Sequence, residues 1–257
     1  MKAFFRVYRN RFWRLTLFNV VYFCLALPLL LVLYICLNAY TGIYVGDSAV
    51  ADVLPGLGFF ISLFPTSTSA GRAFVSVCVA IAAALFGTLK TALFRTEIEF
   101  FTGQYRFFAD VLSALRKKLP QSLALGLLDL LVLGRTVSNL CGVFGLGWPS
   151  AISAVIRVFS LIVLLFWLAF RRWTYLLCAA CGLRLWPILK NSFLLTVSGL
   201  GWTSLCTAVC ALIWGLTFLT LPLVTVVLLP LLSYSASSLA TVCSLYPYVA
   251  EHIIKDV

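Results

Sequence analysis

The sequence of 257 residues has one histidine, one methionine and eight acidic residues, and only 11% of its residues are charged. Soluble domains contain about 25% charged residues, so the composition excludes that class. The single histidine, His252, argues against histidine-based metal sites and catalytic triads. The chain also contains no Walker-type glycine loop, no nucleophile elbow and no HExxH pattern. We therefore expect a non-enzymatic protein with no catalytic residue, metal site or cofactor.

Long apolar runs are present instead, with 63% hydrophobic residues and a mean hydropathy of +1.07. A helix needs about 20 apolar residues to cross a bilayer. The sequence therefore predicts a single transmembrane domain over residues 1–257, an all-α polytopic membrane helix bundle. We expect about six transmembrane helices: Leu15–Ala39, Ala73–Phe94, Gln121–Cys141, Ala151–Phe170, Phe193–Thr217 and Leu223–Tyr246.

Basic residues predict the orientation of the bundle, because positively charged loops stay in the cytoplasm. With the N-terminus inside, all of the 19 Lys and Arg except Arg72, Arg135 and Arg157 fall on the cytoplasmic side. We expect a multi-pass protein of the cytoplasmic membrane with both termini inside. The net charge of +11 then indicates anionic lipid headgroups on the inner face as the partner, not nucleic acid.

The inner segment Arg106–Lys118 predicts a short amphipathic helix, because apolar residues recur in it at helical spacing. It is interpreted either as a connector resting on the inner headgroup layer or as a docking helix for a cytoplasmic partner. The candidate lipid or partner contacts are Arg106, Phe107, Phe108, Val111, Leu115, Arg116, Lys117 and Lys118.

Asp129 lies about 13 Å into the third predicted span at 1.5 Å per residue. A carboxylate at that depth costs at least about 2.5–3.5 kcal/mol, so we expect it to face protein and to be paired or protonated. The candidate cations are Arg135 and Arg157, and Arg157 is favoured because Arg135 points to another face of the same helix. This intramembrane polar pair is interpreted as a structural clamp or as part of a transport site.

Small residues and an apolar outer segment each have two interpretations. Ser76, Ala80, Ala83 and Gly87 lie on one face of the second span, which predicts close helix packing inside the bundle or, alternatively, at a homodimer interface. The segment Val53–Phe64 is too short and too rich in Gly and Pro to span. It rests on the outer surface or enters the bundle as a re-entrant loop.

The nine cysteines are interpreted as packing residues. Cys178 and Cys181 form a CxxC pattern without a second ligand pair, which does not indicate zinc or redox chemistry. Cys206 and Cys210 are four residues apart, as packing residues on one helix face would be.

Three short patterns resemble the YesL-like bacterial membrane proteins, a family defined as a domain of unknown function. They are Leu17–Tyr22 followed by Leu27 and Pro28, Phe107 and Phe108 with the run Arg116–Ser122, and Pro187–Phe193. The resemblance implies a bacterial cytoplasmic-membrane protein of about six helices that accompanies carbohydrate uptake systems. Two functions follow as hypotheses: an accessory protein of ABC transporter subunits for carbohydrate, or a small-solute transporter or permease that acts as an oligomer.

Overall fold

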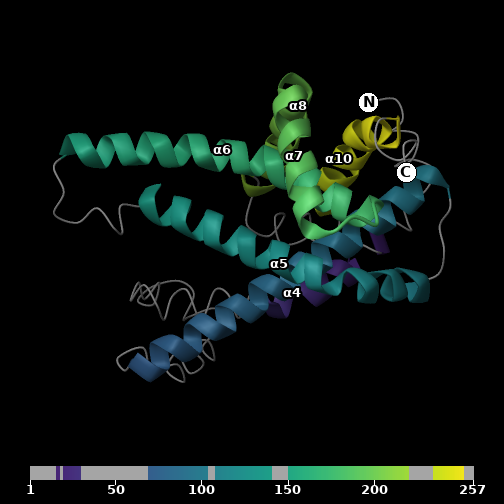
Figure 1. The fold of residues 1–257 in the computed structure, drawn as a ribbon, viewed down its shortest axis with the longest axis horizontal. Helices are drawn as coiled ribbons and strands as arrows, with labels where there is room; N and C mark the ends of the chain where they lie inside the picture. Colours follow the sequence, from purple (N-terminus) through teal and green to yellow (C-terminus); the bar gives the residue numbers. More distant parts are fainter. Residues whose placement is uncertain are drawn as a thin grey trace.

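The computed structural model describes residues 16–17, 20–29, 69–103, 108–140, 150–219 and 234–251. These residues are helical except at Gly103, Gly199 and the loop 181–184, and no strand occurs among them, which confirms the all-α prediction for this part of the chain. A short apolar helix covers Val20–Leu29. The longer helices, labelled in Figure 1, are α4 (Ser69–Thr102), α5 (Phe108–Leu140), α6 (Ser150–Ala180), α7 (Leu185–Ser198), α8 (Leu200–Leu219) and α10 (Tyr234–Val249).

Helices α4, α5 and α6 meet near the middle of the molecule and diverge from it. In Figure 1 the start of α4, the end of α5 and the start of α6 extend separately toward the left. Helices α7, α8 and α10 gather around the other half of α6, where α8 stands across the α6 axis in this view. A cluster of buried apolar side chains lies there, and it includes Trp173, Leu176 and Leu177 near the end of α6.

Two glycines let the backbones of α4 and α5 cross closely. A Cβ on Gly87 would lie 2.5 Å from the carbonyl oxygen of Ser122, and a Cβ on Gly126 would overlap the carbonyl oxygen of Ala83. Neither distance is tolerated between real atoms, so the crossing requires glycine at both positions. The small-residue face predicted for α4 is thus an intramolecular contact at Ala83 and Gly87, whereas Ser76 is exposed.

Helix α6 has an exposed first half and a buried second half. Large apolar side chains of the first half, among them Ile152, Val155 and Phe159, are at least half exposed. In the second half Trp173 and Leu176 are buried among residues from α4, α5, α7 and α10. The exposed apolar surface of the first half suits contact with lipid tails. In the second half, burial of each large apolar side chain stabilises the fold by about 1.5–3 kcal/mol.

The chain turns sharply at Gly199, between α7 and α8. The two helices are bent by 94° relative to one another. The Gly199 N–H still donates to the carbonyl of Leu195 at 3.0 Å, and the Trp173 indole N–H donates to Thr203 Oγ1 at 3.0 Å, which ties the start of α8 to α6. The predicted span Phe193–Thr217 is therefore divided by this bend between the end of α7 and α8. The bend lies beside the buried Trp173, whose ring would be 3.8 Å from a Cβ on Gly199.

Two of the described helices are long and apolar enough to cross a membrane, at Ala73–Thr102 and Ser150–Ala180. A third span is obtained if the bent pair Leu185–Ser198 and Leu200–Leu212 is counted as one. The chain therefore has the apolar helices of a membrane protein. The count of six spans, the position of both termini and the segment Val53–Phe64 lie wholly or partly outside the described residues and stay predictions.

The inner amphipathic segment and the third predicted span form one continuous helix. α5 runs from Phe108 to Leu140 with Pro120 inside it. Proline removes one backbone hydrogen bond but does not end this helix. The separate surface helix predicted to end before Pro120 is thus wrong as an independent element over its described part.

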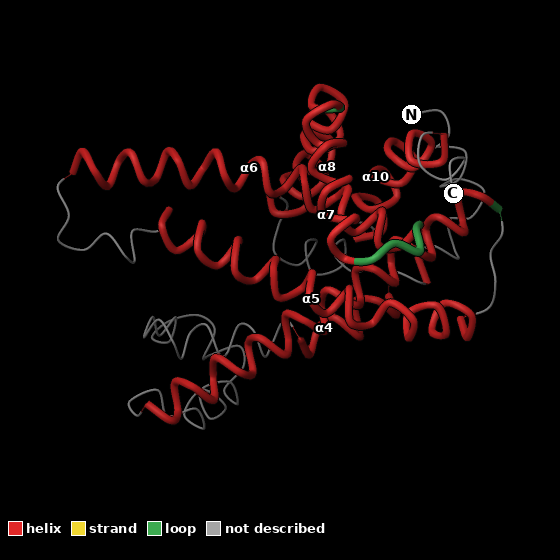
Figure 2. The backbone as a smooth tube through the Cα atoms, in the orientation of Figure 1, coloured by secondary structure: helices red, strands yellow, loops and turns green. Residues whose placement is uncertain are grey.

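Side chains of α4 and α5 cap the C-terminal end of α6. The Lys118 ammonium donates to the carbonyl oxygens of Cys178 and Cys181, and Arg95 Nη1 donates to the carbonyl of Ala179 at 3.3 Å. Gln121 Nε2 donates to the carbonyl of Leu183, in the short loop before α7 that Figure 2 draws in green. Cations at a helix C-terminus satisfy free carbonyls and oppose the helix dipole. These contacts hold the buried end of α6 against α4 and α5.

Candidate ligand-binding cavity

Asp129 is the centre of a buried polar cluster that joins α5 to α6. Its Oδ1 accepts from the Trp167 indole N–H at 2.9 Å. Its Oδ2 accepts from Arg171 Nη2 at 2.8 Å and from the Tyr175 hydroxyl at 2.9 Å. Asp129 is only 8% exposed, so a carboxylate there requires these donors. The three donors recur every four residues along one face of α6.

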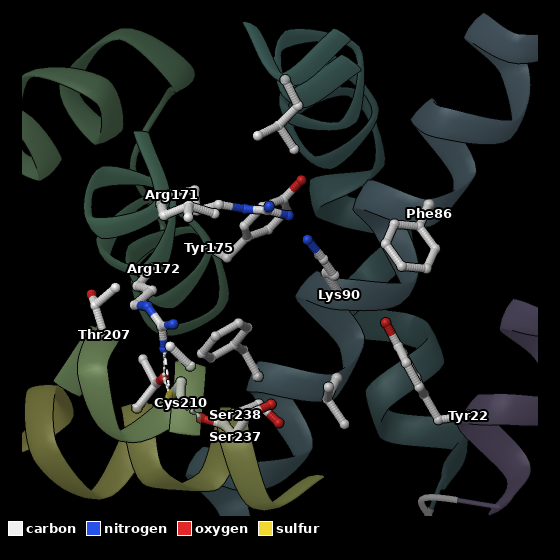
Figure 3. Close-up of a pocket in the computed structure, with 16 residues that line it drawn as sticks. Tyr22, Phe86, Lys90, Arg171, Arg172, Tyr175, Thr207, Cys210, Ser237 and Ser238 are labelled. Atoms are coloured by element: carbon white, nitrogen blue, oxygen red, sulfur yellow. Dashed lines mark hydrogen bonds between the residues drawn. The ribbon is translucent and has the colours of Figure 1, made fainter. Parts of the chain in front are cut away.

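Lys90 brings α4 into the same cluster. Its Nζ lies 3.6 Å from Asp129 Oδ2 and 5.2 Å from the ring centroids of both Phe86 and Tyr175. The Lys90 ammonium therefore makes cation–π contacts with two aromatic rings and an ion pair with one carboxylate. Figure 3 shows Lys90 pointing toward Arg171 and Tyr175 from the opposite helix.

The cations predicted to pair with Asp129 do not do so. Arg157 is exposed on the first half of α6, and Arg135 is exposed on α5. The pairing of Asp129 with Arg157 is wrong because α6 continues to Ala180, which places Arg171, not Arg157, level with the carboxylate. The expectation that Asp129 faces protein and is paired agrees with the geometry.

A cavity of about 470 Å³ opens beside this cluster. Its walls come from α4, α6, α8, α10 and the helix Val20–Leu29, with Leu133 from α5. Figure 3 shows Arg171 and Lys90 near one end of the cavity and Arg172 near the other, beside Cys210. The lining residues are Tyr22, Phe86, Lys90, Leu93, Phe94, Leu133, Leu168, Arg171, Arg172, Tyr175, Thr207, Cys210, Ala211, Ser237, Ser238 and Thr241.

Arg172 supplies a cation at the end of the cavity away from Asp129. Its Nη1 donates to Cys210 Sγ at 2.6 Å and to Thr241 Oγ1 at 3.0 Å. Its Nε is buried without a hydrogen-bond partner among the described residues. No carboxylate among the described residues lies within ion-pair distance of Arg172, whereas the neighbouring Arg171 forms an ion pair with Asp129.

Charge in the cavity wall is unbalanced. The described lining contains Lys90, Arg171 and Arg172 and no carboxylate. Asp129 compensates two of these cations from behind the wall. Glu97, also behind the wall, accepts from the Ser238 hydroxyl at 2.5 Å. The cavity therefore presents positive charge together with serine and threonine hydroxyls to whatever enters it.

The predicted inner-face contacts are only partly described. Arg106 and Phe107 lie outside the described residues, and so do the side chains of Phe108, Val111 and Leu115. Arg116 and Lys117 are exposed, as a lipid or partner contact requires. Lys118 is different: it is half-buried and donates to the end of α6, so its assignment as a lipid contact is wrong. Burial lowers the pKa of the Lys118 ammonium. Its hydrogen bonds to the two carbonyl oxygens replace part of the hydration that burial removes.

The sequence interpretation missed Lys90, Arg171 and Arg172, which it assigned to cytoplasmic ends of spans. One signal was present: Trp167, Arg171 and Tyr175 recur at intervals of four, which places three hydrogen-bond donors on one helix face. Cys210, interpreted as packing, is buried against Cys206 and Ala240 but also borders the cavity. Among the described residues, no group of three or more His, Cys, Asp or Glu is arranged to hold a metal ion.

Comparison of the chain with protein-family models, with curated proteins and with solved structures finds no match. The resemblance to the YesL-like family therefore stays a prediction.

Proposed function

We propose that this protein binds a small organic anion in the cavity between α4, α6, α8 and α10, as the binding step of a membrane transporter. The observation that supports the proposal is the unbalanced charge of the cavity wall. Three cations line it, and no carboxylate does so among the described residues. A bundle that needed only a structural clamp would require Asp129 and Arg171, but it would not require Arg172.

Arg172 is the lining cation without a carboxylate partner among the described residues. A guanidinium removed from bulk water loses solvation that a hydroxyl and a thiol replace only in part. At an effective dielectric constant of about 20, a unit negative charge 4 Å away contributes about 4 kcal/mol. An anion beside Arg172 would supply that interaction. The free Nε of Arg172 leaves a donor for it, which favours a planar carboxylate or a phosphate.

The size and composition of the cavity narrow the ligand class. Pockets for small molecules measure about 300–1,000 Å³, and this cavity falls within that range. Phe86, Leu93, Leu133 and Leu168 provide apolar walls next to the cations. The ligand that fits best is therefore an amphipathic monoanion, with a carboxylate or phosphate head and a short apolar body.

A thermal-shift screen tests this proposal. The purified protein would be heated in nanodiscs with acetate, hexanoate, octanoate and hexyl phosphate, and with hexanol as the uncharged control. We expect octanoate or hexyl phosphate to raise the unfolding temperature and hexanol to leave it unchanged. Arg172→Gln should abolish the shift, whereas Arg157→Gln, which removes an exposed cation outside the cavity, should retain it. Equal shifts in both variants, or none in the wild type, would refute the proposal.

A second candidate function is the accessory role beside a carbohydrate uptake system, as the resemblance to the YesL-like family implies. Its support is a surface of exposed side chains on the side that the basic residues predict to be cytoplasmic. Arg116, Lys117 and Leu119 are exposed on α5, and Trp186 at the start of α7 is 75% exposed. The Gln121–Leu183 hydrogen bond joins α5 to the loop that precedes α7. A crosslinking pull-down from native membranes tests it: recovery of ABC transporter subunits by the wild type but not by Lys117→Glu with Trp186→Ala supports an accessory.

A further inference from the structure

Cys210 is placed differently from the other described cysteines. It lies on α8 and is only 1% exposed, yet it borders the cavity. Its sulfur accepts a hydrogen bond from Arg172 Nη1 at 2.6 Å. The Thr241 hydroxyl lies 3.8 Å from the same sulfur, and the Ser237 carbonyl oxygen lies 3.3 Å from it. Figure 3 shows the guanidinium reaching Cys210 across the end of the cavity.

The other cysteines lack this combination. Cys206, one turn earlier on α8, has the Thr241 hydroxyl at 3.9 Å, and no described cation donates a hydrogen bond to its sulfur. Cys178 and Cys181 are buried where α6 ends, and Cys24 is exposed. Among the seven described cysteines, Cys210 is the one with a guanidinium nitrogen within hydrogen-bond distance of its sulfur.

A neighbouring guanidinium changes the chemistry of a thiol. The thiolate is the nucleophilic form of cysteine, and an adjacent cation stabilises it. Here Arg172 has no carboxylate partner among the described residues, so a thiolate at Cys210 would be its nearest negative charge. The features that oppose ionisation are the burial of the sulfur, Glu97 behind Ser238, and the Ser237 carbonyl, whereas the thiol of Cys206 on the same helix favours it. The direct 2.6 Å contact with the guanidinium is the shortest of the contacts at this sulfur.

We propose that Cys210 is a reactive thiolate that exchanges with low-molecular-weight disulfides entering the cavity. The thiol proton of Cys210 passes to water, and the thiolate attacks one sulfur of the disulfide RSSR. A new S–S bond forms between Cys210 and that sulfur, while the original S–S bond breaks. The departing RS⁻ takes the electron pair and is protonated to RSH. Cys210 is thereby oxidised and the departing sulfur is reduced.

The adduct would change the cavity itself. It would occupy part of the 470 Å³ beside Arg172 and would remove the thiolate as a partner of that guanidinium. Redox state would thus control access to this end of the cavity. The reaction requires only the cavity, Cys210 and Arg172, so it holds whether or not the cavity binds an anion. Even with a thiolate at Cys210, the three lining cations exceed the two compensating charges of Cys210 and Asp129.

The test is a labelling time course with methyl methanethiosulfonate, a small reagent that forms the same S–S bond. Native membranes containing the full chain would be labelled at pH 6.5, and the modified peptides quantified by mass spectrometry. An ordinary thiol with a pKa of about 8.5 is only about 1% thiolate at that pH. We expect Cys210 to react before the exposed Cys24 and at least about tenfold faster than the buried Cys206, with reversal by dithiothreitol. Preferential labelling of Cys24, with Cys210 no faster than Cys206, would overturn the proposal.

Variants separate activation by Arg172 from simple access. Arg172→Met should slow labelling of Cys210 by about tenfold or more without changing the rate at Cys24, and Arg172→Lys should restore part of the rate. Thr241→Val removes a neutral neighbour of the sulfur and should have a smaller effect. If Arg172→Met leaves the Cys210 rate unchanged, the inference is wrong. The comparison of Cys210 with Cys206 in the unmodified protein decides the question even if that variant does not fold.

Discussion

Arg171 Nη2 lies 2.8 Å from Asp129 Oδ2, although the two residues are 42 positions apart in the chain. This ion pair joins the middle of α5 to the second half of α6. The same carboxylate also holds Lys90 of α4, so one residue links three helices. The cavity wall is built on this connection.

Removal of the Asp129 carboxylate should therefore weaken the whole bundle. Asp129→Asn leaves the half-buried Lys90 and Arg171 beside a neutral amide, and breaking a buried charge pair costs at most about 3–5 kcal/mol. We expect a clear fall in the thermal unfolding temperature of the protein in detergent. The double variant Asp129→Asn with Arg171→Gln should recover part of the loss, since one uncompensated charge is removed with it.

Arg157→Gln is the matched control for that experiment. Arg157 is on the same helix as Arg171 but is exposed. Its substitution should leave the unfolding temperature unchanged. A fall for Arg157→Gln as large as that for Asp129→Asn would mean that the clamp lies elsewhere.

The close crossing of α4 and α5 gives a second prediction. Gly126→Ala places a methyl group on the backbone of Ala83 and Ala84, and overpacking of this kind costs about 1–3 kcal/mol. Gly134→Ala on the same helix meets no atom within 4 Å and should be neutral or slightly stabilising. Thermal unfolding of the two variants, side by side, measures the difference. Equal stability would show that α4 and α5 do not approach as closely as described.

The cap on α6 gives a third prediction. Lys118→Met removes the donor to the carbonyls of Cys178 and Cys181 and should cost about 1–2 kcal/mol. Lys117→Met, its exposed neighbour, should have no measurable effect on stability. Proteolysis after Arg184, in the turn that follows the capped end, provides the local measurement. Faster cleavage in Lys118→Met alone is the expected result, and the same rate in both variants would contradict the assignment.

The sequence was sufficient for the helical class and for Asp129 as a polar residue that faces protein. The apolar runs of the sequence locate α4 and α6. Asp129 lies inside another apolar run, where a carboxylate needs a partner. The partner was predicted wrongly, because Arg171 was counted among the charges that set orientation. The length of the apolar run did not reveal that α6 stays helical to Ala180, or that its last residues are buried against the neighbouring helices.

The cavity and the bend could not be predicted in the same way. Gly199 is one of 16 glycines, and nothing in its neighbourhood marks it as the site of a 94° turn. Arg172 meets Cys210 only because that turn brings α8 beside α6. Both features depend on contacts between helices distant in sequence, which hydropathy does not encode.

Direct binding of radiolabelled octanoate to the protein in nanodiscs tests the central claim, that the cavity is an anion site. We predict saturable binding at one site per chain, lost in both Arg172→Gln and Lys90→Met and retained in Arg157→Gln. Non-saturable uptake of octanoate, equal in all four proteins, would contradict it.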